Sequence, residues 1–149
     1  MIKTSLTRLN FIMTDFILHN RLAQDSFFVA DLQLCQIRLI NNQDFIWFIL
    51  VPKINDIVHL TDLSPSQQNI LMQEINLTAG ILQKLFQPSR LNIAALGNVV
   101  AQMHWHIVAR YTTDIAWPNP VWGVPSSLYQ DNKHNAIIDF FKYALSQEA

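Results

Sequence analysis

Two histidines separated by one residue are the side chains of this sequence best suited to chemistry. They lie in Gln102–Val108, which reads Gln-Met-His-Trp-His-Ile-Val and whose alternation predicts a strand. Alternate side chains of a strand point to opposite faces, so we expect Gln102, His104 and His106 to share one polar face. The rise of a strand places neighbouring members of this row about 6–7 Å apart. Both imidazoles can then reach one tetrahedral group such as a phosphate.

The residues of this row are compatible with three interpretations. The histidines can be solvent-facing residues of a half-exposed strand, since histidine is intermediate in burial. They can bind a metal, although the row has no Cys, Asp or Glu, and Asp114 and Glu74 lie outside it. A neutral imidazole can also attack phosphorus while polar neighbours hold the phosphoryl oxygens. We expect no metal ligand and no cofactor.

Length and composition indicate one globular domain over residues 1–149, because half of the residues are apolar and 14% are charged. The formal net charge is −1 and no Lys/Arg cluster occurs, which argues against a nucleic-acid partner. The single cysteine, Cys35, suits a reducing compartment. The first 20 residues contain no uninterrupted apolar core, and the densest apolar stretch, Phe45–Val51, is too short for a membrane helix. We therefore expect a cytoplasmic protein without a membrane segment.

The elements expected to position the row are two helices and two pairs of strands. Ser64-Pro65-Ser66-Gln67 is a capping box that begins a long amphipathic helix, and Pro88 ends it. A second helix is expected near the C-terminus, over about residues 133–145. The strand pairs are expected over residues 34–40 and 45–51 and over residues 91–96 and 102–111. The fold class is α+β, an antiparallel meander sheet with one long helix and a C-terminal helix.

The segment Gly97–Arg110 and the following Trp117–Gly123 resemble the histidine triad family of nucleotide hydrolases and transferases, in particular its bacterial branch of small single-domain proteins. The resemblance covers nearly the whole chain, because it extends upstream through Leu22–Ser26, Leu34–Gln36, Trp47–Pro52 and Leu91–Asn98.

The family pattern is His-φ-His-φ-His-φ-φ, where φ is apolar and the middle histidine forms a covalent nucleotidyl intermediate at the α-phosphate. The resemblance implies that His104 is the nucleophile and that His106 is the third histidine of the row. Gln102 stands where the first histidine usually does. A glutamine donates and accepts hydrogen bonds but does not titrate, so the acid for the leaving group is unassigned.

Three asparagines are implied as substrate-binding residues by the same resemblance. Asn92 matches a polar position that contacts phosphate or leaving group, and Asn98 is a donor to a phosphate oxygen. Asn42 falls where the family often has an acidic residue near the ribose, and an amide accepts less strongly than a carboxylate. Arg110 is about 20 Å beyond His104 along an extended strand, so we assign it a structural or dimer-contact role.

The remaining histidines and the tryptophan-rich loop are assigned other roles. We expect His19 to cap or pack beside a short helix, and His134 to face solvent in the first turn of the last helix. His59 is not assigned the role of the family's outlying fourth histidine, because Asn55 stands at that position. The loop Trp117–Gly123 either packs rigidly or shapes the leaving-group side of the pocket, and the sequence favours packing for its tryptophans.

The sequence leads to two main functional hypotheses. The first is a homodimeric enzyme that cleaves a nucleoside phosphoramidate or dinucleoside polyphosphate at the α-phosphate through a nucleotidyl-His104 intermediate. The second is a nucleotide-binding module with little or no catalysis, suggested by Gln102 and Asn42. A metal-dependent hydrolase is a weaker third hypothesis.

Overall fold

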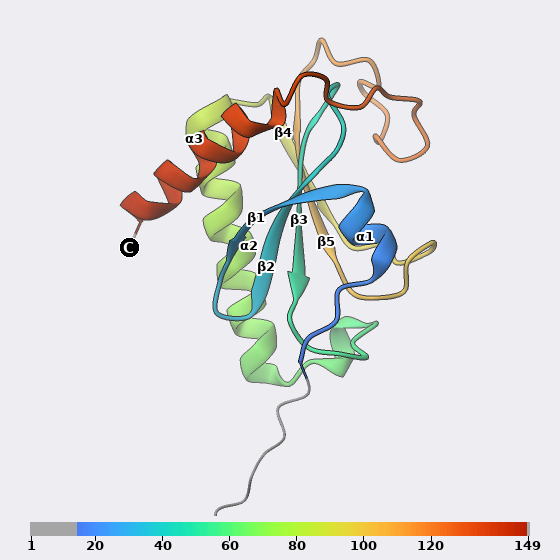
Figure 1. The fold of residues 1–149 in the computed structure, drawn as a ribbon, viewed down its shortest axis with the longest axis vertical. Helices are drawn as coiled ribbons and strands as arrows, with labels where there is room; N and C mark the ends of the chain where they lie inside the picture. The colour runs from blue at the N-terminus through green and yellow to red at the C-terminus, as the bar shows by residue number, and fades with distance from the viewer. Residues whose placement is uncertain (1–14, 149) are drawn as a thin grey trace, which may run out of the picture.

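The computed structural model describes residues 15–148, and Figure 1 shows its elements in chain order. Residues 1–14, which hold most of the N-terminal segment discussed above, and residue 149 lie outside the described part. The elements are α1 (Asn20–Gln24), β1 (Ser26–Asp31), β2 (Cys35–Ile40), β3 (Ile46–Pro52), the 3-10 helix η1 (Leu60–Asp62), α2 (Pro65–Phe86), β4 (Arg90–Ala94), β5 (Trp105–Arg110) and α3 (His134–Gln147). Within residues 15–148, none of the helices has the length and apolar character needed to span a bilayer.

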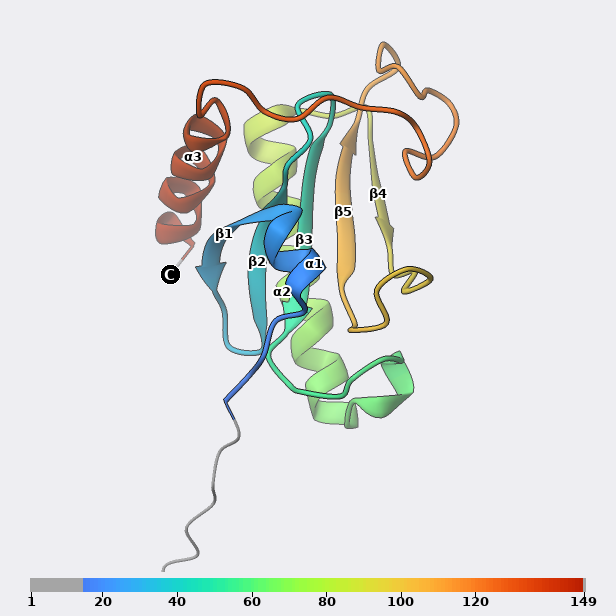
Figure 2. The same ribbon diagram turned by 45° about the vertical axis from the view of Figure 1, so that its right-hand side comes forward.

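The five strands form one antiparallel sheet in the order β1-β2-β3-β5-β4, which confirms the α+β class. Figure 2 shows α1 in front of this sheet and α2 behind it. The chain crosses behind the sheet through α2, adds β4 at the edge, and returns as β5 between β3 and β4. Strand β5 is almost entirely buried whereas β4 is half-exposed, so the more apolar strand takes the central position.

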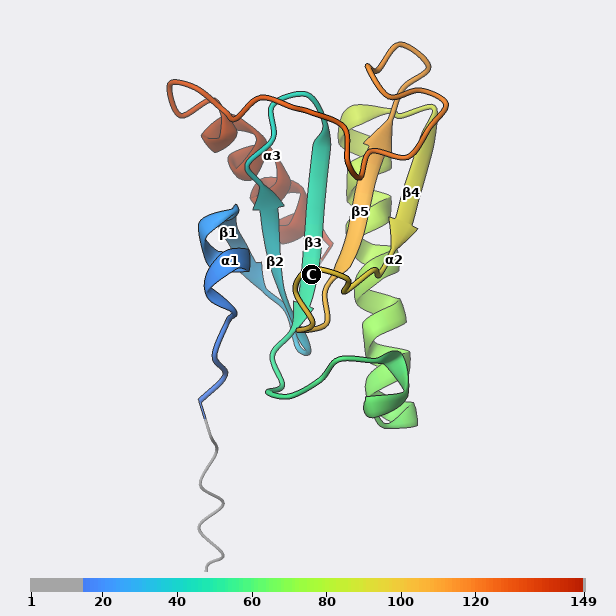
Figure 3. The same ribbon diagram turned by 90° about the vertical axis from the view of Figure 1, so that its right-hand side faces the viewer.

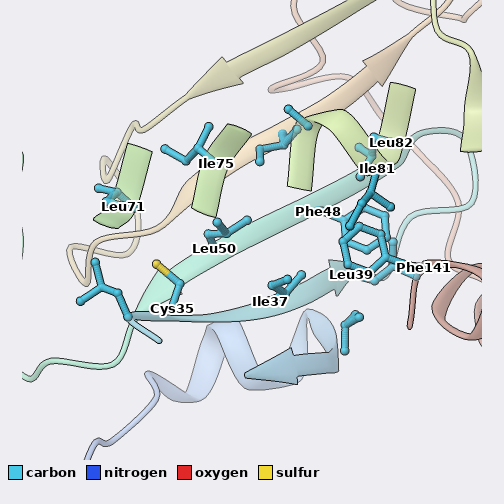
Figure 4. Packing of buried hydrophobic residues seen from close by; sticks show 14 of the residues in the cluster. Cys35, Ile37, Leu39, Phe48, Leu50, Leu71, Ile75, Ile81, Leu82 and Phe141 are labelled. Carbon is cyan, nitrogen blue, oxygen red and sulfur yellow. The ribbon is translucent and has the colours of Figure 1, made fainter. Parts of the chain in front are cut away.

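Helix α2 begins and ends as the sequence predicts. The Ser64 hydroxyl accepts from the Gln67 backbone N–H and the Gln67 amide accepts from the Ser64 N–H, which completes the capping box. Gln87 closes the helix in the left-handed conformation, one residue before Pro88. Figure 4 shows the apolar stripe of α2 packed on the sheet and on Phe141 of α3. This face of the sheet holds the main core.

The strand that was predicted to carry both histidines is shorter than expected and contains only His106. We expected it to begin at Gln102, but β5 begins at Trp105, and residues 95–104 form a loop at the end of the sheet where β5 starts (Figure 3). The backbone N–H of Met103 donates to the carbonyl oxygen of Ile57 instead of to a neighbouring strand, at 2.9 Å. Strand alternation therefore applies from Trp105 to Arg110 only, where Trp105 and Ile107 face the main core and His106 faces the other side.

A buried arginine holds the loop after β5 to the sheet. Arg110 is 2% exposed, and its Nε and Nη2 donate to the carboxylate of Asp114 at 2.7 and 3.0 Å. Its Nη1 donates to the side-chain oxygen of Asn92 on β4, and Nη2 also donates to the carbonyl of Asn119. The same arginine keeps the pKa of Asp114 below its usual value through the side-chain hydrogen bond. Arg110 has the structural role that its distance from His104 suggested.

We expect the substitution Arg110→Met to destabilise the protein by about 3–5 kcal/mol, because it leaves the buried Asp114 carboxylate without its cation. Urea denaturation of the full chain measures this change. The double variant Arg110→Met/Asp114→Asn removes the orphaned charge and should recover part of the loss. A free energy of unfolding for Arg110→Met within about 1 kcal/mol of the intact protein would contradict the assignment.

Candidate active site

The two histidines lie beside a cavity of about 280 Å³ on the face of the sheet that α1 covers. Helix α1 lines it with Arg21, Leu22 and Asp25, and the sheet contributes Ile40 and Trp47. The loop 96–100 and Trp122 complete the lining together with the two imidazoles. The cavity is therefore built from six parts of the chain, namely α1, β2, β3, the loop 95–104, β5 and the loop after β5.

His106 is neutral and carries its proton on Nε2. It is 7% exposed, and its Nδ1 accepts a hydrogen bond from the indole Nε1–H of Trp47 at 2.9 Å. A ring nitrogen can accept only when it is unprotonated, so the proton of the neutral ring lies on Nε2. Burial, the larger cause, and the neighbouring His104 together lower the pKa of His106 to about 3. His106 is therefore a neutral hydrogen-bond donor.

His104 has the opposite tautomer. Its Nδ1 lies 2.7 Å from the backbone carbonyl oxygen of Gln102, which can only accept, so the ring proton is on Nδ1. Burial lowers the pKa of His104 as well, and the neutral ring has an unprotonated Nε2. The ring centroids of His104 and His106 are 4.8 Å apart with an interplanar angle of 68°. A ring with an unprotonated Nε2 and a ring with an Nε2–H donor are thus direct neighbours.

The structure does not place the side chain of Gln102 with the two histidines. Its Oε1 accepts from the backbone N–H of His19 and its Nε2 donates to the carbonyl oxygen of Ile17, both at 2.9 Å. Gln102 does not line the cavity. The prediction of a three-residue polar face is wrong at this position, because residues 102–104 precede β5 and strand alternation does not extend to them. Only the backbone of Gln102 acts on the site, through His104.

Of the three asparagines, Asn98 is the one that lines the cavity. Its side chain is exposed, so it can donate to a ligand. Asn92 instead accepts from Arg110 and stands opposite Val108 in the β4–β5 pair. Its amide oxygen thus binds the arginine that holds the loop after β5, and Asn92 does not line this cavity.

Asn42 lies beside an adjoining cavity of about 440 Å³, which shares Trp47 and Trp122 with the first. It is 5% exposed. Its Oδ1 accepts from the backbone N–H groups of Asp44 and Phe45, and its Nδ2 donates to the Ser126 hydroxyl. These contacts hold the β2–β3 turn and occupy both ends of the amide.

Several cavity residues have no clear signal in the sequence. Trp47 selects the tautomer of His106, and the Trp122 ring lies 5.3 Å from the same imidazole. Arg21 brings a cation to the wall, where it pairs with Asp25 at 3.3 Å. The sequence alone does not show that Trp47 contacts His106, because this contact depends on the pairing of β3 with β5. A short polar helix gives no indication of the cavity that it covers.

Two tryptophans of the loop after β5 have different positions in the structure. Trp122 lines the cavity, whereas the Trp117 ring lies 5.7 Å from the guanidinium of Arg110 and packs there. Among the other histidines, His19 caps α1 as expected, because its Nδ1 accepts from the Arg21 N–H. His134 does not simply face solvent: its ring stacks on Phe27 with centroids 3.7 Å apart. Stacking on Phe27 removes one face of each ring from water.

A metal site finds no support in the geometry of residues 15–148, where no three His, Cys, Asp or Glu side chains are grouped so that they could hold an ion.

Comparisons with known proteins agree with this geometry. Residues 21–113 match the HIT domain family. A solved histidine triad protein of Bradyrhizobium japonicum is 37% identical with a TM-score of 0.86, covering 89% of this chain and 99% of its own. One of Marinobacter aquaeolei is 36% identical with a TM-score of 0.86, covering 91% and 100%. The chain belongs to the HIT domain family. None of the curated proteins matches it.

A more distant solved structure shares the fold alone. It is a diadenosine triphosphate hydrolase of Plasmodium falciparum, 15% identical with a TM-score of 0.62, and the match covers 84% of this chain and 78% of that one.

We expect the free energy of unfolding to fall as the pH is lowered from 7 to 4. The unfolded chain protonates His106 near its usual pKa of 6.5, whereas the folded state resists protonation down to about 3. The unfolded state therefore binds more protons in this window, and His106 contributes up to about 1.4 kcal/mol per pH unit. Urea denaturation at several pH values measures the slope. His106→Asn should flatten it, and an identical slope in both proteins would contradict the burial argument.

Proposed function

We propose that this protein is a nucleotide hydrolase or transferase that acts at the α-phosphate of a dinucleoside polyphosphate or nucleoside phosphoramidate through a nucleotidyl-His104 intermediate. The observation that supports it is the pair of complementary neutral tautomers on His104 and His106 beside one cavity. Membership of the HIT domain family favours a nucleotide as ligand. We also infer the small bacterial branch of the family, a single domain, a homodimer and a cytoplasmic location.

In the first step, Nε2 of His104 attacks the α-phosphorus. A P–N bond forms and the bond from phosphorus to the leaving group breaks. The Nδ1–H of His104 stays bonded to the carbonyl of Gln102, which stabilises the positive charge that develops on the ring. The Nε2–H of His106 and the amide of Asn98 donate to phosphoryl oxygens. Water then displaces His104 and releases the nucleotide.

The same geometry favours a phosphate leaving group over an amine. A departing amine needs a proton, whereas a departing phosphate leaves as a stable anion. Gln102 has no titratable proton, and a neutral imidazole such as His106 is a very weak acid. We therefore expect a dinucleoside polyphosphate to be cleaved faster than a phosphoramidate of the same nucleoside.

The second candidate is a nucleotide-binding module without turnover, and two observations favour it. The side chain of Gln102 does not face the cavity, and the amide of Asn42 binds the β2–β3 turn through its oxygen and Ser126 through its nitrogen. Calorimetry combined with mass spectrometry separates the two candidates, because a binding module takes up nucleotide and forms no adduct on His104.

We expect His104→Ala to lower turnover by about 10³-fold or more, because it removes the nucleophile. Steady-state assays with dinucleoside polyphosphates and phosphoramidates measure the loss, and mass spectrometry of a quenched reaction shows the adduct in the intact protein only. His134→Ala is the matched control, since His134 does not line the cavity. The absence of turnover of any of these substrates by the intact protein would contradict the proposal.

We expect Trp47→Phe to lower kcat about tenfold with a smaller change in KM. The change removes the donor that holds Nδ1 of His106 unprotonated, so that the ring can adopt the tautomer that no longer donates from Nε2. Trp117→Phe is the control, because its ring packs on Arg110 outside the cavity. Equal kcat values for both variants would show that the Trp47 hydrogen bond has no part in the reaction.

A further inference from the structure

Two side-chain amides hold the backbone of residues 15–19, which we call the arm. Asn55 donates from Nδ2 to the carbonyl oxygen of Asp15 and accepts at Oδ1 from the N–H of Ile17, at 3.0 and 2.9 Å. Gln102 donates from Nε2 to the carbonyl oxygen of Ile17 and accepts at Oε1 from the N–H of His19, both at 2.9 Å. Each amide thus binds one carbonyl and one N–H two residues apart, which is how a neighbouring β-strand would bind the arm.

The arm leads directly into the cavity wall. The imidazole of His19 accepts from the Arg21 N–H and so caps α1. Helix α1 is anchored by Leu22, which is buried against Ile49 and Val51 on this face of the sheet. The exposed side of the same helix brings Arg21 and Asp25 to the cavity. The position of the arm therefore bears on the position of this wall.

Gln102 joins the arm to the reacting group. Its side chain binds Ile17 and His19, and its backbone carbonyl accepts from Nδ1 of His104. A displacement of the arm is thus transmitted through a single residue to the imidazole that we propose as nucleophile.

The hydrogen-bonding groups of Gln102 and Asn55 explain why amide side chains stand at these two positions. Gln102 and Asn55 stand at the two positions where the sequence resemblance places histidines of the family. A primary amide carries its donor and its acceptor on one small planar group, whereas a neutral imidazole carries them on separate edges of a ring. Only the amides can bind a carbonyl and an N–H of one extended segment side by side.

We propose that Gln102 and Asn55 form an amide clamp that fixes the arm, positions α1 against His104, and tightens when a nucleotide binds. Both are positioning residues, since their side chains do not line the cavity that holds the two histidines. The choice of a nucleotide as the ligand rests on the proposed function, whereas the clamp itself does not.

Residue-resolved amide hydrogen exchange of the full chain tests the clamp without ligand. Gln102→Ala and Asn55→Ala should each accelerate exchange at both Ile17 and His19 by roughly fivefold or more, the effect of losing one net hydrogen bond. Gln83→Ala, a change to an exposed amide on α2, should leave both rates unchanged. Unchanged rates in the clamp variants, or acceleration confined to the N–H that the substituted residue itself binds, would overturn the proposal.

Gln102→Glu separates the clamp from loss of folding. A carboxylate still accepts from the His19 N–H but cannot donate to the Ile17 carbonyl, so the variant keeps half of the contact at the same size. Loss of the bond to the Ile17 carbonyl should loosen the arm and so accelerate exchange of the Ile17 N–H, which Asn55 binds, while α2 amides exchange at the rate of the intact protein. Protection of the arm equal to that of the intact protein would count against the clamp.

The coupling to the ligand is measured by titration with AMP. Saturating AMP should slow exchange at His19 in the intact protein, and Asn55→Ala should weaken AMP binding about fivefold and raise KM with little change in kcat. Equal AMP affinity in the intact and Asn55→Ala proteins would overturn the positioning role. If AMP does not bind the intact protein, the proposed function fails, while exchange without ligand still decides whether the clamp exists.

Discussion

The hydrogen bond from Nδ1 of His104 to the backbone carbonyl of Gln102 is the contact on which the proposed chemistry depends. Because a carbonyl only accepts, this bond assigns the ring proton to Nδ1 and leaves the lone pair on Nε2. His104 lies outside β5, so no strand pairing orients it. The loop that carries it is instead braced by the backbone bond from Met103 to Ile57. The His104 ring was expected to be oriented by a strand. It is instead oriented by a loop whose backbone is hydrogen-bonded.

Burial keeps both imidazoles in their neutral forms. Both imidazoles are under 10% exposed, and removal from water disfavours their charged forms, which lowers both pKa values. The indole of Trp47 then selects the second tautomer at His106. The reacting phosphate would therefore meet neutral groups, while the charged pair of Arg21 and Asp25 lies on the wall formed by α1.

Much of the fold follows from signals that act over a few residues. The capping box at Ser64 and the stop at Pro88 bound α2 correctly, because helix ends depend on backbone groups that neighbouring side chains satisfy. Strand β1 was not predicted, since its half-exposed edge position leaves only a weak alternation. Local sequence signals also did not predict the strand order β3-β5-β4. It depends on which strand the main core buries best, and that is a property of the assembled sheet.

For the site, the sequence by itself determined that two neighbouring histidines project from one segment, and that His19 caps a short helix. It could not determine what each amide side chain binds. Gln102 binds the arm, and Asn42 binds its own turn and Ser126, because partners up to 85 residues away come within hydrogen-bond distance only after folding. The tertiary structure likewise decided that Trp47 reaches His106 across the β3–β5 pair. Residue types set which hydrogen bonds are possible, and only packing sets which are made.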